Sequence, residues 1–272
     1  MSAVARWMLV WAALLAGPVL AECGGFGGAC ETAQGTYLIE FPDQDLPPMV
    51  VFLHGYGGSA SGTLRNRRMV EPLLARGYAV MAPDGALRNG RKSWNFYPGW
   101  EGRDEAAFLA EAVQDAVRRF DIDPDRVILG GFSAGGFMVN YLACATPDAF
   151  SAYVPVSGGF WRPHPDGCAG PVRLFHTHGW TDNVVPLEGR ALGGGRFLQG
   201  DIFAGLEIWR QANGCADNRP DGFAATGPFL RRHWTRCADG SALEFALFPG
   251  GHTVPAGWAD MMLDWYEGLP GG

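Results

Sequence analysis

Short, mainly apolar runs alternate along this chain with longer stretches in which apolar residues recur every three to four positions. The short runs are typical of buried strands, and they occupy 36–41, 49–53, 78–84, 126–129, 152–157, 171–179, 229–236 and 243–248. The longer stretches are typical of helices that bury one side, and they occupy 62–76, 104–120, 137–144, 202–212 and 258–266. This alternation predicts an α/β fold, with a mostly parallel central sheet covered by helices on both faces.

Two segments interrupt the alternation. Residues 85–102 combine glycines with several aromatic residues, and residues 186–200 contain three consecutive glycines. Loops rich in aromatic side chains at one end of a sheet are suitable walls for an apolar or planar ligand. We therefore expect both segments to border a binding pocket. Trp94 and Trp180 are expected either to touch the ligand there or to cap the core.

The first residues predict an export signal. Arg6 is followed by an apolar stretch and then by the small residue Ala21, which is a suitable cleavage position. The apolar stretch is too short to span a bilayer as a stable helix, although an uncleaved anchor is an alternative interpretation. We expect residues 1–21 to be a cleaved signal peptide and residues 22–272 to form a single domain. The mature protein is expected to be secreted or periplasmic, without stable membrane insertion.

Six cysteines lie beyond this segment: Cys23, Cys30, Cys144, Cys168, Cys215 and Cys237. An even number in an exported chain indicates disulfides, for which fifteen connectivities exist. Closeness in the sequence favours three pairs, Cys23–Cys30, Cys144–Cys168 and Cys215–Cys237. Free thiols or a zinc site are less favoured, because the sequence contains no Cys-x-x-Cys pair.

The formal net charge of the chain is −7, with 47% hydrophobic and 18% charged residues, a composition that can fill a substantial core. The 21 basic residues are nearly all arginine and are scattered along the sequence. Nucleic-acid-binding domains instead carry clustered basic side chains. We therefore expect no nucleic-acid partner, and we expect a monomer.

Residues 131–135 read Gly-Phe-Ser-Ala-Gly, and they lie between the predicted strand at 126–129 and the predicted helix at 137–144. A Gly-x-Ser-x-Gly run in this setting holds a serine on a sharp turn, with its hydroxyl above the sheet. Glycines are needed because side chains beside the serine would collide with the neighbouring strand and helix. Ser133 is therefore the predicted nucleophile.

A serine hydroxyl attacks only when a base takes its proton and a third group orients that base. An acid and then a histidine are expected to follow the serine in the sequence. Asp182 follows the predicted strand at 171–179, and His252 follows the one at 243–248. We assign His252 as general base and acid, and Asp182 as the group that orients it. Three other aspartates lie in a Pro- and Gly-rich stretch or a turn and are less favoured: Asp217, Asp221 and Asp239.

The same chemistry needs backbone N–H groups that stabilise an oxyanion. A His-Gly-Tyr-Gly-Gly loop at 54–58 directly follows an apolar strand and fits the second donor loop of such hydrolases. We assign the N–H groups of Tyr56 and Ala134 as the two donors, and we expect His54 to support the loop without reacting. No metal or cofactor is expected, and His176 with His178 is not expected to be a metal pair.

Together these motifs resemble the secreted α/β-hydrolase esterases grouped around polyhydroxybutyrate depolymerase-like and feruloyl or acetylxylan esterase-like proteins. The similarity extends from about residue 35 to 265 and rests on residues 53–58, 93–95, 104, 108, 123–127, 131–136, 178–182, 185–186 and 251–253. It implies an α/β-hydrolase catalytic domain over residues 22–272 and hydrolysis of carboxylic esters, with the triad on Ser133, Asp182 and His252. It also supports the pairs Cys144–Cys168 and Cys215–Cys237.

The leading hypothesis is a secreted serine esterase that works through an acyl-enzyme. The resemblance implies small or oligomeric ester substrates, namely feruloyl or other aryl esters, acetyl esters, or hydroxyalkanoate oligomers. Two alternatives stay open. The same triad serves serine peptidases, and a catalytically silent protein could use the pocket for binding alone.

Overall fold

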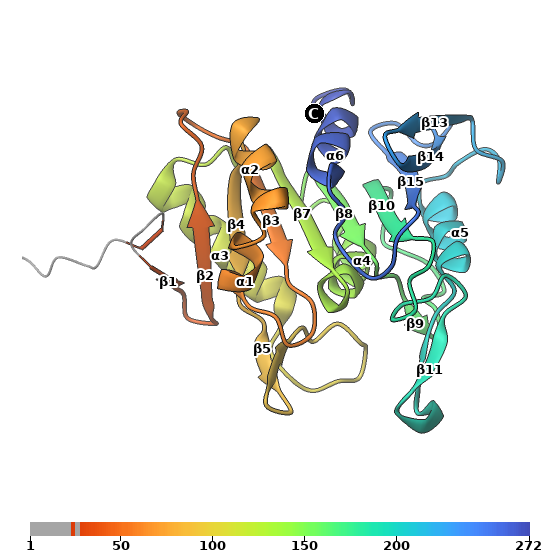
Figure 1. The fold of residues 1–272 in the computed structure, drawn as a ribbon, viewed down its shortest axis with the longest axis horizontal. Coiled ribbons are helices and arrows are strands. Elements are labelled where there is room, and N and C mark those ends of the chain that lie inside the picture. The colour runs from red at the N-terminus through yellow and green to blue at the C-terminus, as the bar shows by residue number, and fades with distance from the viewer. Residues whose placement is uncertain (1–22, 25–27) are drawn as a thin grey trace, which may run out of the picture.

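A sheet of ten strands forms the centre of the molecule in the computed structural model, which describes residues 23–24 and 28–272 (Figure 1). The predicted signal peptide lies outside the described residues. The strands of the sheet, in spatial order, are β1 (Cys30–Glu31), β2 (Thr36–Glu40), β4 (Ala79–Pro83), β3 (Met49–Leu53), β7 (Val127–Phe132), β8 (Ala152–Val156), β10 (Arg173–Gly179), β15 (Ala242–Phe248), β14 (Phe229–Trp234) and β13 (Gly222–Thr226).

The strands from β4 to β15 in this order run parallel to one another, and antiparallel strands close the sheet at both edges. All residues of β3, β4 and β8 are buried, as expected for parallel strands covered on both faces. Parallel strands end at the same edge of a sheet. The loops that follow β3, β7, β10 and β15 therefore lie together at that edge.

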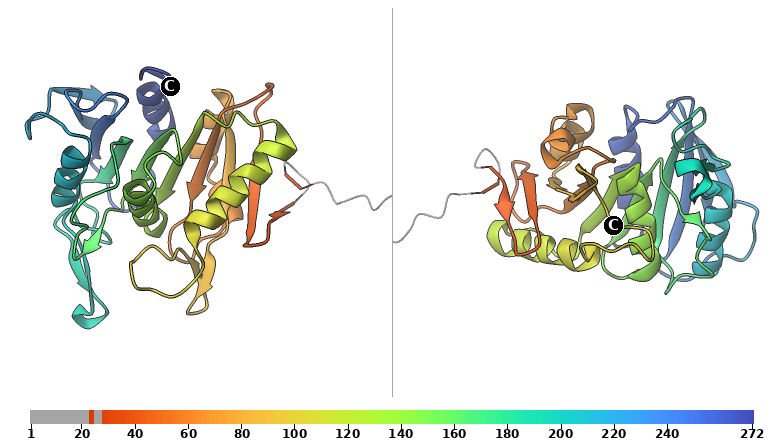
Figure 2. Two further views of the ribbon diagram at one scale, coloured as in Figure 1. Left: turned by 180° about the vertical axis from the view of Figure 1, so that it is seen from behind. Right: turned by 90° about the horizontal axis from the view of Figure 1, so that it is seen from below.

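Helices cover both faces of the sheet, as predicted (Figure 2). One layer contains α1 (Ala60–Leu64), α2 (Arg67–Ala75) and α6 (Trp258–Glu267), and the other contains α3 (Glu105–Phe120), α4 (Ala134–Ala145) and α5 (Ile202–Ala212). Alternate strand residues point into the two layers: Val50 and Ile128 pack with the first layer, whereas Val51 and Leu129 pack with the second. Burial of apolar side chains on both faces supplies the main stabilisation of this architecture.

The predicted helix at 62–76 is wrong as a single element, because the structure divides it into α1 and α2. Asn66 takes a ψ of 73°, outside the helical region, and the chain changes direction there. Asparagine competes for backbone hydrogen bonds and favours helix ends over interiors. The break lets the second segment bury Met69, Val70 and Leu73 against the sheet.

The predicted helix that begins at Asp104 is confirmed as α3. The carboxylate of Asp104 caps this helix by accepting a hydrogen bond from the N–H of Ala107.

The two segments predicted to be irregular contain short strands. Residues 85–102 include a hairpin of β5 (Ala86–Arg88) and β6 (Arg91–Ser93), and residues 186–200 include β11 (Arg190–Leu192), a 3₁₀ turn (Gly193–Gly195) and β12 (Phe197–Gln199). The first hairpin turns at Asn89-Gly90, with φ values of 51° and 74°. Asn-Gly with two positive φ angles is the signature of a tight hairpin turn. Strand β9 (Trp161–Arg162) joins β12 in a small separate sheet.

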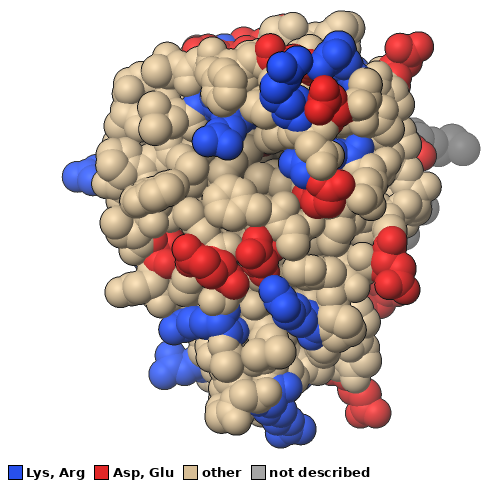
Figure 3. Space-filling model, turned by 90° about the vertical axis from the view of Figure 1, so that its right-hand side faces the viewer, with Lys and Arg blue, Asp and Glu red and all other residues tan. Residues whose placement is uncertain are grey.

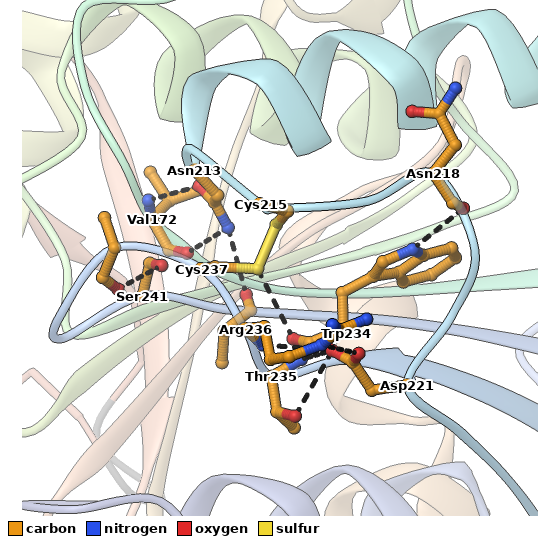
Figure 4. Close-up of a disulfide and its surroundings, with 12 residues drawn as sticks. Val172, Asn213, Cys215, Asn218, Asp221, Trp234, Thr235, Arg236, Cys237 and Ser241 are labelled. Atoms are coloured by element: carbon orange, nitrogen blue, oxygen red, sulfur yellow. Dashed lines mark hydrogen bonds and ion pairs between the residues drawn. A yellow bond between two sulfur atoms is a disulfide. The ribbon is translucent and has the colours of Figure 1, made fainter.

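All three expected disulfides form: Cys23–Cys30, Cys144–Cys168 and Cys215–Cys237. The last of these connects the chain after α5 to the loop between β14 and β15 (Figure 4). Beside it, the side chain of Asn213 exchanges hydrogen bonds of 2.9 Å with both the N–H and the C=O of Val172. The disulfide thus fixes the end of α5 to the β14–β15 loop, and the Asn213 side chain fixes it to the start of β10.

None of the helices within residues 23–24 and 28–272 is long and apolar enough to cross a membrane.

Replacing Cys144 and Cys168 together by alanine is expected to lower the free energy of unfolding by about 3 kcal/mol, because the crosslink restricts the unfolded chain over a separation of 24 residues. Urea denaturation under non-reducing conditions measures the change. Replacing Cys23 and Cys30, which are separated by 7 residues, is the matched control and is expected to cost less. Equal stability of the Cys144/Cys168 variant and the wild type would contradict the prediction.

Candidate active site

Ser133 is the single residue that joins the end of β7 to the start of α4, and it adopts a positive φ of 56°. Non-glycine residues take such a conformation only where the surroundings enforce it. Here the enforcing contact is close backbone packing. A Cβ atom on Gly135 would lie 2.3 Å from the carbonyl oxygen of Leu53, and one on Gly131 would lie 2.6 Å from the backbone of Gly135. The two glycines of the motif are therefore required sterically.

The structure brings together the three side chains assigned from the sequence. His252 Nε2 lies 2.9 Å from Ser133 Oγ, and His252 Nδ1 lies 2.8 Å from Asp182 Oδ2. An ionised carboxylate only accepts hydrogen bonds, so Nδ1 carries the ring proton and donates it to Asp182. The lone pair of Nε2 then faces the hydroxyl of Ser133. This is the tautomer in which the imidazole can take a proton from the serine.

Asp182 is held in place by the loop on which it lies. Its Oδ1 accepts hydrogen bonds from the N–H groups of Val184 and Val185, at 2.9 and 2.8 Å. Burial acts to raise the pKa of Asp182, but the hydrogen bonds from His252 and Val185 and the nearby imidazoles outweigh it and hold the pKa below its ordinary value. The carboxylate therefore stays charged, and one of its oxygens is reserved for His252.

The loop after β3 is positioned by His54. The N–H of Gly85 donates to His54 Nε2 at 3.0 Å, so Nδ1 carries the proton and donates to the carbonyl oxygen of Gly55 at 2.7 Å. In a trans peptide the C=O and the following N–H point in opposite directions. The bond to Gly55 therefore turns the N–H of Tyr56 away from the His54 ring. Burial lowers the pKa of His54 and keeps the ring neutral. The expected supporting position of His54 is confirmed.

The Tyr56 and Ala134 N–H groups assigned as donors are both available for a ligand. Neither donates a hydrogen bond to any acceptor within residues 23–24 and 28–272. Tyr56, Ser133 and Ala134 all line one cavity of about 600 Å³. Two unused backbone donors beside a nucleophile form the arrangement that stabilises an oxyanion.

Trp94 does not lie at this cavity, which corrects one expectation from the sequence. Its side chain is fully buried, and its Nε1–H donates to the carbonyl oxygen of His54 at 2.8 Å. It therefore supports the loop from beneath and cannot touch a ligand. Trp180 does not line the cavity either, and its side chain is 63% exposed to solvent.

The cavity wall is aromatic, and most of its members were not singled out from the sequence: Phe96, Trp100, Phe137, Trp161 and Phe197. Trp161 is central to this group, with ring centroids 5.1 Å from Phe96 and 5.3 Å from both Trp100 and Phe197. The rings come from the segment at 85–102, from α4, from β9 and from β12. Both irregular segments thus border the cavity as predicted. Trp161 and Phe137 carried no local signal, because each lies in an element that also fills the core.

His176 and His178 form a buried pair behind Asp182. His176 Nε2 lies 3.0 Å from His178 Nδ1, and His178 Nε2 donates to the carbonyl oxygen of Val185 at 2.8 Å. Burial lowers the pKa of both imidazoles, so both rings are neutral. Their contacts support the Asp182 loop. In the described part of the chain, no group of three or more His, Cys, Asp or Glu side chains is arranged to hold a metal ion.

A second groove of about 590 Å³ lies between α3 and α4 and is lined mainly by apolar side chains. No serine, cysteine or histidine is among its lining residues.

The fold and the serine elbow agree with the comparison of the sequence with known protein families. The model of the α/β hydrolase fold matches residues 48–183, which is half of the chain. The chain belongs to the α/β hydrolase fold family. The matched region includes the loop at residues 54–58, Ser133 and Asp182.

Several characterised proteins are similar to this chain. Feruloyl esterase B of Piromyces equi is 28% identical over 197 residues, covering 65% of this chain and 35% of that protein. A probable feruloyl esterase C of Aspergillus terreus is 27% identical over 231 residues, covering 79% and 75%. Poly(3-hydroxyalkanoate) depolymerase C of Paucimonas lemoignei is 31% identical over 118 residues, covering 42% and 28%. The chain thus spans about a third of the length of the first and the last of these.

Solved structures agree on the fold. The acetyl xylan esterase from Aspergillus awamori has a TM-score of 0.64 at 16% identity, covering 85% of this chain and 93% of that chain. A Bacillus cereus carboxylesterase has a TM-score of 0.58 at 16% identity, covering 87% and 95%.

Gly135→Ala is expected to lower the free energy of unfolding by about 3 kcal/mol, because the added methyl group meets the backbone of Leu53, which cannot rotate away. The matched control is Gly167→Ala, since a Cβ there has no atom within 4 Å. Thermal and urea unfolding of the two variants measure the difference. If the Gly135 variant is as stable as the Gly167 variant, the close contact between Gly135 and the backbone of Leu53 is absent.

Proposed function

We propose that this protein is a secreted serine hydrolase of carboxylic esters that works through an acyl-enzyme. The observation that carries the proposal is the chain of hydrogen bonds from Ser133 Oγ through His252 to Asp182. Ser133 lies at a cavity that also contains two unused backbone N–H donors. The similarity to feruloyl esterases and to a polyhydroxyalkanoate depolymerase supports ester hydrolysis.

In the proposed acylation, Ser133 Oγ attacks the ester carbonyl carbon while its proton passes to His252 Nε2. The imidazolium that forms is stabilised by Asp182, whose carboxylate already accepts the Nδ1 proton. The carbonyl oxygen becomes negatively charged and accepts hydrogen bonds from the N–H groups of Tyr56 and Ala134. Each such donor contributes about 2.7–4 kcal/mol to transition-state stabilisation.

The intermediate then collapses as the C–O bond to the alcohol breaks, and His252 donates its proton to the departing oxygen. Deacylation repeats these steps with water in place of the serine: His252 takes a proton from water, the hydroxide attacks the acyl carbon, and Ser133 leaves with the proton. The products are a carboxylic acid and an alcohol, and no cofactor takes part.

The cavity favours a planar acyl group over an acetyl group. Its volume of about 600 Å³ and its aromatic rings suit an aryl or hydroxycinnamoyl chain, whereas an acetyl group would leave most of that apolar surface in contact with water. We therefore place feruloyl-type and other aryl esters ahead of acetyl and hydroxyalkanoate esters as substrates.

Three disulfides support a site of action outside the reducing cytoplasm. The apolar N-terminal stretch and Ala21 support export through a cleaved signal peptide.

Ser133→Ala is expected to lower kcat on a methyl hydroxycinnamate by about 10⁶-fold, because the variant lacks the hydroxyl that lies 2.9 Å from His252 Nε2. Hydrolysis is followed by chromatography of the released acid, and circular dichroism checks the fold. A fluorophosphonate probe is expected to label the wild type at Ser133 and to leave the variant unlabelled. Failure to label the wild type would favour a binding protein, and faster cleavage of an anilide than of the ester would favour a peptidase.

Asp182→Asn is expected to lower kcat by about 10⁴-fold with little change in KM. The amide nitrogen can face Nδ1 and force the proton onto Nε2, the tautomer that cannot accept a proton from Ser133. Steady-state kinetics on the same ester measure both constants. The control is Asp239→Asn, which changes one charge in an exposed turn before β15, at the end of that strand opposite to His252. A loss confined to KM would contradict the orienting role.

A further inference from the structure

Three arginines surround the cavity at Ser133. Arg88 from β5, Arg190 from β11 and Arg196 from the turn between β11 and β12 all contribute to its lining. No aspartate or glutamate is among the lining residues. The chain as a whole has 28 acidic and 21 basic residues, whereas the charged residues that line this cavity are all basic.

These three guanidinium groups have no acidic partners in the protein. None of them forms an ion pair with a carboxylate in the part of the chain that the structure describes, whereas arginines elsewhere do, among them Arg103 with Glu105 and Arg231 with Glu244. On the face shown in Figure 3, Lys and Arg groups lie both on the upper part and on the lower part, toward which the β11–β12 hairpin projects in Figure 1, with Asp and Glu groups between them. The charge of the three arginines is therefore available to a ligand.

Two of the arginines are also held in place. The guanidinium of Arg88 lies 3.7 Å from the ring centroid of Trp100, and Arg190 Nε donates to Gln199 Oε1 at 3.2 Å. Stacking on an aromatic ring and a side-chain hydrogen bond both limit rotamer freedom, which lowers the entropic cost of binding an anion. The buried indole N–H of Trp161, another lining residue, donates to none of the described residues and offers a further donor.

The part of the ester that enters this cavity is the acyl group. His252 must donate a proton to the leaving oxygen, so the alcohol has to lie beside His252. Ser133, Ala134 and Tyr56 line the cavity, but His252 does not. The alcohol therefore departs on the His252 side, and the acyl chain extends from Ser133 along the aromatic rings toward the arginines.

We propose that the preferred substrates are esters of a planar, apolar acyl group that carries a carboxylate at the end remote from the ester bond. The rings of Trp100, Trp161 and Phe197 pack against the planar part, and Arg88, Arg190 and Arg196 bind the carboxylate. This inference rests on the proposed esterase function. The reaction is unchanged: water adds across the acyl C–O bond, the alcohol leaves with one proton, and a dicarboxylic acid is released.

Two matched esters test this specificity, methyl 4-carboxycinnamate and its uncharged isostere methyl 4-carbamoylcinnamate. Guanidinium groups at a solvent-exposed rim form individually weak ion pairs, so three together are expected to give about a tenfold higher kcat/KM for the charged ester. Because such pairs are screened by salt, the ratio is expected to fall as the ionic strength rises. The released acids are measured by chromatography.

The double variant Arg190→Gln/Arg196→Gln is expected to lower the ratio of the two kcat/KM values from about tenfold to about twofold, because only Arg88 remains to bind the carboxylate. Arg88 is left unchanged, because its guanidinium also packs against the wall at Trp100. The control Arg232→Gln removes a charge on β14, outside the cavity lining, and is expected to retain the wild-type ratio. Thermal unfolding verifies that all variants are folded.

Equal rates for the two esters in the wild type would overturn this inference while leaving the esterase function intact. A preference for the charged ester that is undiminished in the double variant would also overturn it, because the carboxylate would then bind elsewhere. If neither ester is cleaved but a fluorophosphonate labels Ser133, the acyl class is wrong. If Ser133 is not labelled, the proposed esterase function fails first.

Discussion

The close approach of α4 to β3 and β7 is the constraint on which the site depends. Where Gly135 passes the carbonyl of Leu53, there is no room for a Cβ atom, and the chain must turn from strand to helix within one residue. That residue is Ser133, whose positive φ is fixed because its N–H bonds to Val156 and its C=O bonds to the N–H of Phe137. Strain of this kind persists only when neighbouring structure over-determines it. The rigid placement of this hydroxyl at the cavity follows from packing alone.

The register of the parallel strands brings the rest of the site to this hydroxyl. Residues at or next to the ends of neighbouring strands are paired: Leu53 with Gly131, Phe132 with Val156, and Gly179 with Phe248. The loops after β3, β7, β10 and β15 therefore start at nearly the same level of the sheet. Asp182 and His252 come three and four residues beyond their strands, which is close enough for both to reach the elbow. Residues 119 positions apart thus meet at 2.9 Å.

The sequence was sufficient for the central parallel strands and for the meeting of Ser133, Asp182 and His252, because apolar runs and single chemically specialised residues carry those signals locally. It was insufficient for the cavity wall. Trp94 and Trp100 lie in the same aromatic segment, yet one supports His54 and the other lines the cavity. These two tryptophans follow the β5–β6 hairpin in the sequence, and the hairpin itself could have been predicted from its Asn89-Gly90 turn. Trp161 depends on contacts among four distant segments, which no local pattern encodes.

The burial of Trp94 also helps to fix the loop at residues 54–58 by contacts between groups that stay neutral, whereas His252 changes charge in the proposed reaction. The loop that presents the Tyr56 N–H is held by the indole of Trp94, the ring of His54 and the N–H of Gly85. Protonation of His54 would set an Nε2–H against the N–H of Gly85. This conflict acts in the same direction as burial, which already lowers the pKa of His54. The loop is therefore fixed by hydrogen bonds between neutral groups, and its shape does not depend on the protonation changes that the proposed reaction imposes on His252.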